Sequence, residues 1–362
     1  MLDGVRIIEI EGLGPGPFAA MMFADLGAEV IVVHREQPPS PAWPDRNLID
    51  RGKRSIVLDL KQDADRQTLA QLLDTADGLI EGFRPGVMER LGFGPEQVHE
   101  SNPSLVYGRI TGWGQDGPLA QVAGHDLNYI GLSGALWYAS DPSTPPFTPP
   151  TLTGDIGGGA LYLVTGMLAG LLKARSTGKG CVVDAAIVDG SAHTMNLLMS
   201  TQAAGLLSQQ RGMSYLDGPP WSRCYATADG QWLSVQCLEA KFYAEFLEKL
   251  GLRDDPDFSQ NPDPAAWPEL TARFKTIFAS HNRKHWIDLF DGSDACVAAV
   301  LSPGDSQDQP HMRARQTWLE KNGQLQARPA PRFDGRLPDV PADPPKRGEH
   351  TAEIRAELSL HE

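Results

Sequence analysis

Cysteine is scarce in this chain, with only Cys181, Cys224, Cys237 and Cys296 among 362 residues. None of them forms a C-x-x-C pair, and four thiols are too few for the disulfide framework of a small secreted domain. The N-terminus also lacks the basic stretch and apolar stretch that together mark a secretory signal. The sequence therefore predicts reduced cysteines and a cytoplasmic location.

Long hydrophobic runs and positive charge are also in short supply. The most apolar run, residues 160–172, is shorter than the ~20 residues of a membrane span, so it predicts a buried helix and no membrane span. Lys and Arg number 32 against 46 Asp and Glu, which gives a net charge of −14. Such a chain has no overall attraction for nucleic acid or anionic lipid, so an anionic ligand requires a local basic cluster.

Strand-like and helix-like segments alternate through the first half of the chain. The expected strands are residues 5–10, 29–33, 55–60, 78–82, 105–110 and 181–188, and the expected helices are residues 18–26, 66–75 and 160–174. This rhythm predicts an α/β fold with a parallel, doubly wound sheet, in which ligands bind at the carboxyl ends of the strands.

The second half predicts a different architecture. A helix is expected over residues 192–207, a hairpin around residues 228–230, and helices over residues 241–250, 268–280, 283–290 and 349–358. We therefore expect a large domain (1–185, completed by 330–362), a linker helix (186–224), a smaller α+β domain (225–320), and a return linker with the C-terminal tail (321–362).

Two segments of the first domain are candidate anion sites. The glycine-rich residues 12–17 follow the first strand, but Pro17 replaces the last glycine of a dinucleotide fingerprint. The second strand ends in His34 and Arg35 instead of an acidic residue, which disfavours a nicotinamide dinucleotide and suits a phosphate. Residues 46–54 carry four basic residues and one acidic one, so they form either a solvated loop or a phosphate-binding patch.

Acid/base chemistry has candidates in His125 and Asp155. Asp126 is placed to orient His125, although an isolated histidine is more often structural. Asp155 precedes three glycines and an apolar helix, so it is either a helix N-cap or a carboxylate at a ligand site with exposed N–H groups. His281 and His285 are spaced i, i+4 without an evident third ligand, so no metal site is predicted.

A further set of segments has an order and spacing that are jointly specific. They are residues 11–18, 24–28, 51–55, 58–61, 83–91, 111–115, 123–129, 154–155, 178–180, 216–218, 238–243 and 293–297. On these segments the chain resembles the α-methylacyl-CoA racemases of the family III CoA-transferase superfamily. The resemblance implies a Rossmann-like large domain, a smaller α+β domain and an interlocked homodimer. It also implies that no cofactor is used, because coenzyme A is part of the acyl-CoA thioester substrate.

The same resemblance implies roles for individual residues. His125 and Asp155 would be the catalytic acid/base pair, and Glu239 would tune the histidine. Coenzyme A contacts would come from Arg35, Leu58, Asp59, Leu60, Lys61, Gly124, Asp126, Leu127, Asn128 and Tyr129. To these we add Arg84 and Arg90 as further candidates for phosphate contacts.

The reaction implied is racemisation or epimerisation of 2-methylacyl-CoA thioesters by a two-base 1,1-proton transfer through an enolate. The alternative is a family III CoA-transferase in which Asp155 acts as a nucleophile. A third class is a CoA-binding protein without catalytic activity, against which His125, Asp155 and Glu239 argue.

Overall fold

The computed structural model describes residues 1–38, 44–258 and 263–360. These residues form two compact units, called here the first unit (Met1–Leu136, Phe147–Asn196, Arg328–Glu362) and the second unit (Trp137–Pro146, Leu197–Ala327). The sequence assigned residues 137–146 to the large domain, whereas the structure groups them with the second unit. Trp137 Nε1 donates to the Gln209 carbonyl at 2.9 Å, and Tyr138 Oη donates to the Ser208 carbonyl at 3.1 Å.

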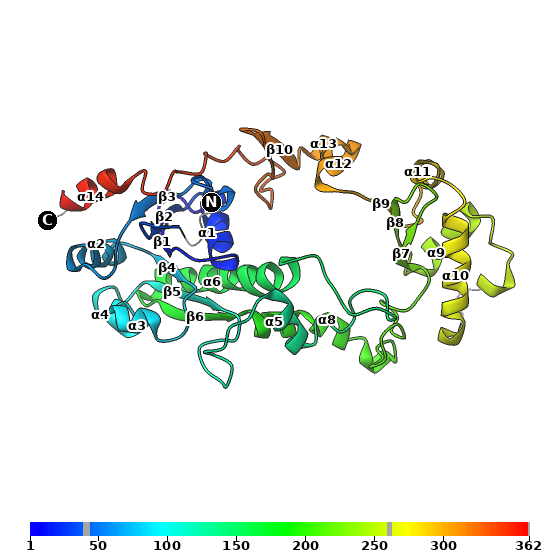
Figure 1. Ribbon diagram of the computed structural model, residues 1–362, viewed down its shortest axis with the longest axis horizontal. Helices are drawn as coiled ribbons and strands as arrows, with labels where there is room; N and C mark the ends of the chain where they lie inside the picture. The colour runs from blue at the N-terminus through cyan, green and yellow to red at the C-terminus, as the bar shows by residue number, and fades with distance from the viewer. Residues whose placement is uncertain (39–43, 259–262, 361–362) are drawn as a thin grey trace. The chain divides into compact units, whose positions relative to one another are not determined.

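A six-stranded, fully parallel sheet forms the centre of the first unit (Figure 1). Its strands are β1 (Arg6–Ile10), β2 (Glu29–His34), β3 (Arg54–Val57), β4 (Gly78–Glu81), β5 (Val106–Thr111) and β6 (Cys181–Ala186). The spatial order is β3-β2-β1-β4-β5-β6, which confirms the predicted doubly wound sheet. The order in which successive strands are added to the sheet reverses between β1 and β4. Such a switch point is where sheets of this kind bind ligands.

Helices cover both faces of this sheet, which explains why its strands are apolar on both sides. One face packs against α1 (Pro15–Asp25) and α6 (Leu161–Thr177), and the other against α2 (Asp63–Asp74), α3 (Val87–Leu91), α4 (Pro95–Ser101) and α14 (Thr351–Ser359). Helix α1 begins three residues earlier than predicted, at Pro15, because proline is well suited to the first helical position.

Three helical segments follow the sheet's carboxyl edge. They are α5 (Asp126–Ser133), the π-helical segment η2 (Leu152–Ala160) that continues into α6, and α7 (Ile187–Thr194). The stretch Leu152–Thr177 is long and apolar enough to cross a membrane by length and composition. However, Leu163 and Met167 are fully buried against the sheet, so this stretch is a core helix.

The predicted helix over residues 192–207 is interrupted in the structure. Helix α7 ends at Thr194, followed by α8 (Asn196–Met199) and a short turn η3 (Gln202–Ala204). Gly205 then adopts a left-handed conformation with φ 71°, which ends helical geometry. The linker is therefore a series of short segments.

The second unit is built on an antiparallel sheet of β7 (Ser222–Ala226), β8 (Trp232–Gln236) and β9 (Val297–Val300). The pairing of β7 with β8 confirms the predicted hairpin. An aromatic core joins this sheet to α9 (Ala240–Lys249), α10 (Trp267–Phe278) and α11 (Arg283–Phe290). The remaining elements are η1 (Leu48–Asp50) in the first unit and η4 (Pro256–Phe258), η5 (Pro264–Ala266), α12 (Pro303–Asp308), α13 (Pro310–Arg315), β10 (Trp318–Lys321) and β11 (Gln324–Ala327) in the second.

Candidate active site

A cavity of about 360 Å³ lies at the carboxyl ends of β1, β4 and β5, at the switch point of the sheet. Residues at the strand ends or directly after them line it, namely Glu11, Gly12, Gly82, Phe83, Thr111 and Gly112. The sequence-predicted residues Gly124, His125, Tyr129 and Asp155 line the same cavity. The structure thus brings the two expected acid/base groups together in one pocket.

Asp155 lies in the π-helical segment η2 and is half-buried. Burial and the neighbouring Asp126 carboxylate raise the pKa of Asp155 to about 6, and His125 opposes them only in part. A carboxyl group with this pKa can both give and take a proton near neutral pH. The N-cap interpretation is wrong, because Asp155 stands inside a continuous helical segment and not at its start.

Asp126 holds the backbone around Asp155. Its Oδ1 accepts hydrogen bonds of 2.9 Å from the N–H groups of both Gly154 and Asp155. The expectation that Asp126 orients the His125 imidazole is therefore wrong, because its bonding oxygen serves the η2 backbone and its buried Oδ2 has no partner among the described residues.

His125 is the N-cap of α5, with its side chain exposed at the cavity. The backbone N–H of His125 donates to Asn128 Oδ1 at 3.0 Å, so Asn128 stabilises the start of the helix. The next N–H groups, of Asp126 and Leu127, have no acceptor among the described residues. They point from a helix N-terminus, where partial positive charge favours an anionic oxygen.

A second cavity of about 510 Å³ adjoins the first. It is lined by five residues that the resemblance assigned to coenzyme A, namely Arg35, Leu58, Asp59, Leu60 and Lys61. The two cavities share Glu11, Arg35 and Phe83, so a long ligand can extend from one into the other. Arg35 Nε lies 3.6 Å from Glu11 Oε2, but the Arg35 side chain is 63% exposed and Lys61 is exposed, so an anion can reach both cations.

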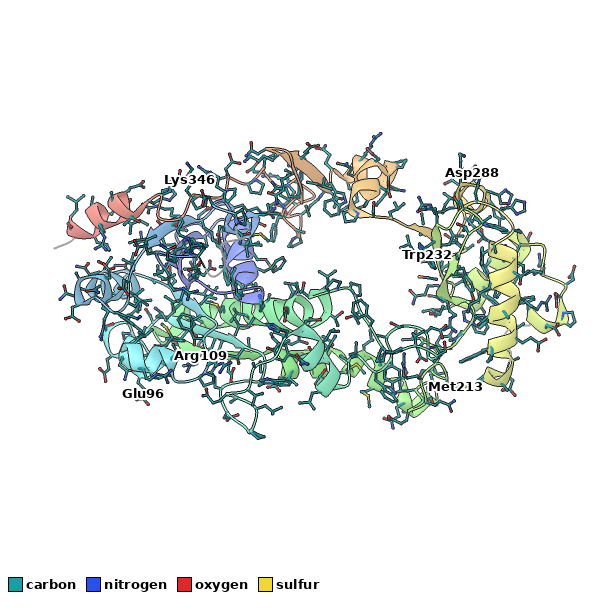
Figure 2. All side chains as sticks on the ribbon, in the orientation of Figure 1. Glu96, Arg109, Met213, Trp232, Asp288 and Lys346 are labelled. Atoms are coloured by element: carbon teal, nitrogen blue, oxygen red, sulfur yellow. The ribbon has the colours of Figure 1, made fainter. Side chains whose placement is uncertain are left out.

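Ion pairs fix the strand ends beside Phe83, one of the three described residues that the two cavities share. Arg109, labelled in Figure 2, donates from Nε to Glu81 at 2.7 Å and from Nη1 to Glu89 at 2.7 Å. The other oxygen of Glu81 accepts the Phe83 N–H at 2.7 Å. These contacts join β4, β5 and α3, and they set the position of Phe83 between the two cavities.

Several predicted binding residues do not line either cavity in the described part of the chain. They are Arg84, Arg90, Asp126, Leu127 and Asn128. In contrast, Glu11 and Phe83 were missed as individual site residues. The signal was present, because Glu11 directly follows β1 and Phe83 follows β4 by one residue, at the two strands of the switch point.

The basic segment over residues 46–54 is not a phosphate-binding patch. Arg51 pairs with Asp25 at 2.6 Å, and Lys53 is buried against Glu9 at 2.6 Å. The remaining cations are also used internally, since Arg54 pairs with Glu29, Glu353 and Glu357, and Arg46 pairs with Glu349. Carboxylates of the same chain thus neutralise the local positive charge that suggested a phosphate-binding patch.

Glu239 lies in the second unit, where it is the exposed N-cap of α9. Its backbone carbonyl accepts the N–H groups of Phe242 and Tyr243 at 3.0 Å. Its charge adds to burial in raising the pKa of Tyr215. The role expected for Glu239 toward His125 stays a prediction.

Similarity to known proteins extends over nearly the whole length of this chain. Residues 2–351 match CoA-transferase family III. The chain is 40% identical over 364 residues to alpha-methylacyl-CoA racemase of Mus musculus and 39% identical over 366 residues to that of Homo sapiens, covering 99% of this chain and 94% of each relative. A crystal structure of a CAIB/BAIF family protein from Brucella suis superposes with a TM-score of 0.83 at 27% identity, covering 98% of both chains.

Proposed function

The chain belongs to CoA-transferase family III, and from this membership we propose that it is a 2-methylacyl-CoA racemase, an isomerase of acyl-CoA thioesters. The observation that carries the proposal is the pairing of His125 with Asp155 in one cavity at the switch point of the sheet. The full-length similarity to two proteins named alpha-methylacyl-CoA racemase supports the same reaction.

The proposed reaction inverts the carbon next to the thioester carbonyl. A thioester acidifies its α-hydrogen, because the enolate that forms places charge on oxygen. One of His125 and Asp155 removes the proton from one face, and the other delivers a proton to the opposite face. Two groups are required because a single base returns the proton to the face that it came from.

The charge of the enolate requires a partner during the transfer. We assign this role to the positive end of α5, whose N-cap residue His125 lines the catalytic cavity. His125 is then close to the α-carbon of a thioester whose oxygen lies at this helix end. Tyr129 supports the loop before α5, since its hydroxyl donates to the Gly124 carbonyl.

Coenzyme A itself is assigned to the second cavity. The apolar Leu58 and Leu60 suit a purine ring, and the exposed Arg35 and Lys61 suit phosphates. The shared residues Glu11 and Phe83 would then border the pantetheine arm on its way to the catalytic cavity. We propose that no metal or redox cofactor is used, because the two side chains and the thioester supply the chemistry.

Proton exchange in deuterated water tests the proposal. Incubation of an (S)-2-methylacyl-CoA with the protein is expected to incorporate deuterium at C2 and to produce the R isomer. Asp155→Ala is expected to reduce the exchange by at least about 100-fold while coenzyme A binding remains. Exchange at the wild-type rate in Asp155→Ala would remove Asp155 from the mechanism.

A family III CoA-transferase is the second candidate, supported by the family match itself. In that reaction the Asp155 carboxylate attacks the thioester carbonyl, coenzyme A leaves as the thiolate, and an acyl-enzyme anhydride forms. Transfer of coenzyme A to an added carboxylate, without deuterium at C2 of any branched acyl-CoA, would favour this reaction over racemisation.

We propose further that the protein is an interlocked homodimer in the cytoplasm. Edge strand β6 and helix α6 expose the apolar Val182, Leu161 and Leu172, which are 45%, 42% and 71% exposed. An open strand edge beside apolar side chains is typical of a surface that another chain covers. The four free cysteines support a reducing compartment.

A further inference from the structure

The C-terminal tail runs along the open edge of β3, which pairs with β2 on its other side. The Gly348 N–H donates to Ser55 Oγ at 2.8 Å, and the His350 N–H donates to the Ser55 carbonyl at 2.9 Å. The Val57 N–H donates to Thr351 Oγ1 at 3.1 Å. The tail therefore occupies the place that a further strand would take, although it lies about 290 residues from β3 in sequence.

Arg347 extends from this tail to the wall shared by the two cavities. Its Nη2 donates to Glu11 Oε1 at 2.6 Å, and its Nη1 donates to the Arg35 carbonyl at 2.8 Å. The other oxygen of Glu11 accepts the Arg35 N–H at 3.0 Å. Arg347 thus joins the carboxyl ends of β1 and β2, and it fixes the backbone that carries the exposed Arg35 side chain.

Arg355 makes a second connection, on the opposite wall of the cavity assigned to coenzyme A. Its Nη2 donates to Asp65 Oδ1 at 2.6 Å, and its Nη1 donates to Thr68 Oγ1 at 3.0 Å. Asp65 in turn accepts the Asp59 N–H at 2.6 Å. Asp59, Leu60 and Lys61 line this cavity, so the tail supports both walls.

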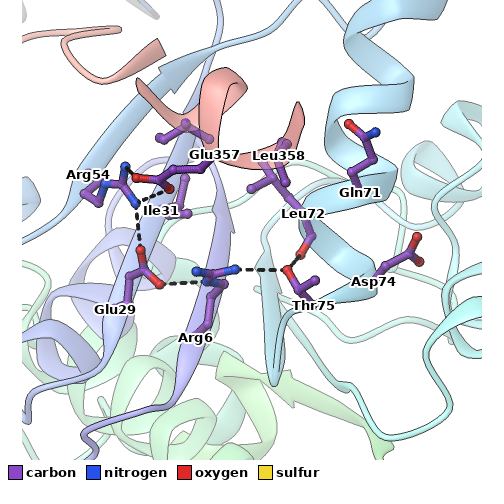
Figure 3. Close-up of a pocket in the computed structure, with 11 residues that line it drawn as sticks. Arg6, Glu29, Ile31, Arg54, Gln71, Leu72, Asp74, Thr75, Glu357 and Leu358 are labelled. Atoms are coloured by element: carbon purple, nitrogen blue, oxygen red, sulfur yellow. Dashed lines mark hydrogen bonds and ion pairs between the residues drawn. The ribbon is translucent and has the colours of Figure 1, made fainter. Parts of the chain in front are cut away.

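The tail has a separate anchor at the amino end of the sheet. Arg54 pairs there with Glu29, Glu353 and Glu357, and Figure 3 shows the contacts of Arg54 with Glu29 and Glu357 beside a cavity of about 450 Å³. None of these residues lines the two cavities at the carboxyl edge. Attachment of the tail and support of the cavity walls therefore depend on different side chains.

We propose that Arg347 and Arg355 are positioning residues for the nucleotide half of coenzyme A. This inference rests on the proposed function. The exposed Arg35 and Lys61 can bind phosphates only from a backbone held in one position, and the tail supplies that support through Glu11 and Asp59. A thioester that lacks the nucleotide does not use the phosphate contacts of Arg35 and Lys61, so it is insensitive to the two arginines.

Substrates with and without the nucleotide test this inference. With a 2-methylacyl-CoA, Arg347→Ala is expected to raise KM by about 10-fold or more at unchanged kcat, because hydrogen bonds to charged groups carry this much affinity. With the N-acetylcysteamine thioester of the same acid, kcat/KM is expected to stay within about twofold of the wild type. Arg355→Ala is expected to give a smaller shift of the same kind, since it acts through Asp65.

Arg336→Ala is the matched control, because Arg336 belongs to the same tail and lines neither of the two carboxyl-edge cavities. It is expected to leave both substrates unaffected. If Arg347→Ala does not fold, Arg347→Lys, which cannot bond Glu11 and the Arg35 carbonyl in the same geometry, must show the selective KM increase. An equal loss of activity with both thioesters would overturn the inference, since it would indicate a general structural role.

Calorimetric titration with coenzyme A separates this inference from the proposed reaction. Binding by the wild type that weakens in Arg347→Ala supports the positioning role even if no deuterium exchange occurs. Equal binding by the wild type and Arg347→Ala overturns the positioning role alone. A wild type that does not bind coenzyme A overturns both.

Discussion

The chemistry of the site depends on two neighbouring carboxylates that have different tasks. Asp126 is buried and uses Oδ1 to hold the N–H groups of Gly154 and Asp155. Because its charge is close to Asp155, it also adds to burial in raising the pKa of Asp155 to about 6. One residue thus fixes the position of the proposed acid/base and adds to the burial that raises its pKa.

Substitution Asp126→Asn separates these two effects. Asparagine keeps an oxygen that can accept both N–H groups but removes the negative charge, so the pKa of Asp155 is expected to fall below about 6. For the reaction direction in which Asp155 is the base, the acidic limb of the pH profile of kcat/KM for deuterium exchange should then move to lower pH. Asp126→Ala removes the acceptor as well and should lower the rate at every pH. An unchanged acidic limb in Asp126→Asn would contradict the electrostatic role.

Lys53 is a charged residue that is buried within a network of polar partners. Its Nζ donates to Glu9 at 2.6 Å, to Asp50 at 3.0 Å and to the Pro17 carbonyl at 3.1 Å. Its side chain is fully buried, and burial is the main cause that raises the pKa of Glu9. Since Pro17 belongs to the start of α1, Lys53 ties the glycine-rich segment to β1.

Replacing Lys53 by methionine is expected to lower the free energy of unfolding by about 3–5 kcal/mol, because Glu9 would remain buried without its partner. Urea denaturation measures this change. Lys179→Met is the control, because Lys179 is exposed and its side chain makes no ion pair within the described residues. It should change stability by less than about 0.5 kcal/mol. Equal effects of the two substitutions would refute a structural role for the buried network.

At the scale of elements, the segment that carries Asp155 is held by close contact between two backbones. A Cβ at Gly190 of α7 would lie 1.9 Å from the Gly158 carbonyl oxygen, and a Cβ at Gly158 would lie 2.3 Å from Ser191 Oγ. Such distances are possible only for glycine. The glycines after Asp155 therefore serve helix packing against α7, whereas the sequence suggested a ligand site with exposed N–H groups.

Gly190→Ala is expected to separate α7 from η2 and displace Asp155. Overpacking of this kind costs about 1–3 kcal/mol, and it should be accompanied by a large loss of deuterium exchange. Gly304→Ala in α12 is the control, because its Cβ would be 3.8 Å from the nearest atom and the exchange rate should not change. Thermal unfolding and exchange assays measure both effects. Full activity of Gly190→Ala would show that the contact does not position Asp155.

At the scale of the whole molecule, net charge and ligand charge are separate matters. The chain carries −14, yet the site proposed for a polyanionic thioester has Arg35 and Lys61 exposed at one cavity. Internal carboxylates instead neutralise the denser basic segment over residues 46–54. Local access to cations decides what is bound, because surface charges more than about 10 Å apart are screened by salt.

The exposed face of α6 and β6 gives a whole-molecule prediction. Light scattering is expected to give twice the chain mass of 39.3 kDa, in line with the proposed homodimer. Leu172→Glu should weaken this association, because Leu172 is 71% exposed and apolar. Leu360→Glu, at a residue 85% exposed beyond α14, is the matched control and should leave the mass unchanged. A monomeric wild type would refute the homodimer.

Local periodicity in the sequence was enough to predict several parts of the fold. Apolar β-branched runs marked the strands of the parallel sheet, and turn residues at 228–230 marked the hairpin of the second unit. The order of strands and helices along the chain also predicted that a ligand binds at the carboxyl ends of the parallel strands. The residue pattern offered His125 and Asp155 as acid/base candidates, the family resemblance gave them the catalytic role, and the structure brings them into one cavity.

The pairing of charges, in contrast, became visible only once the chain was folded. Residues 46–54 look like an anion site in sequence, but their partners include Glu9, Asp25 and Glu357, which lie far away along the chain. The link from Arg347 to Glu11 spans 336 residues, and no local pattern encodes it. The physical reason is that periodicity reports which side chains are buried, whereas pairing of charges depends on which distant segments the fold brings together.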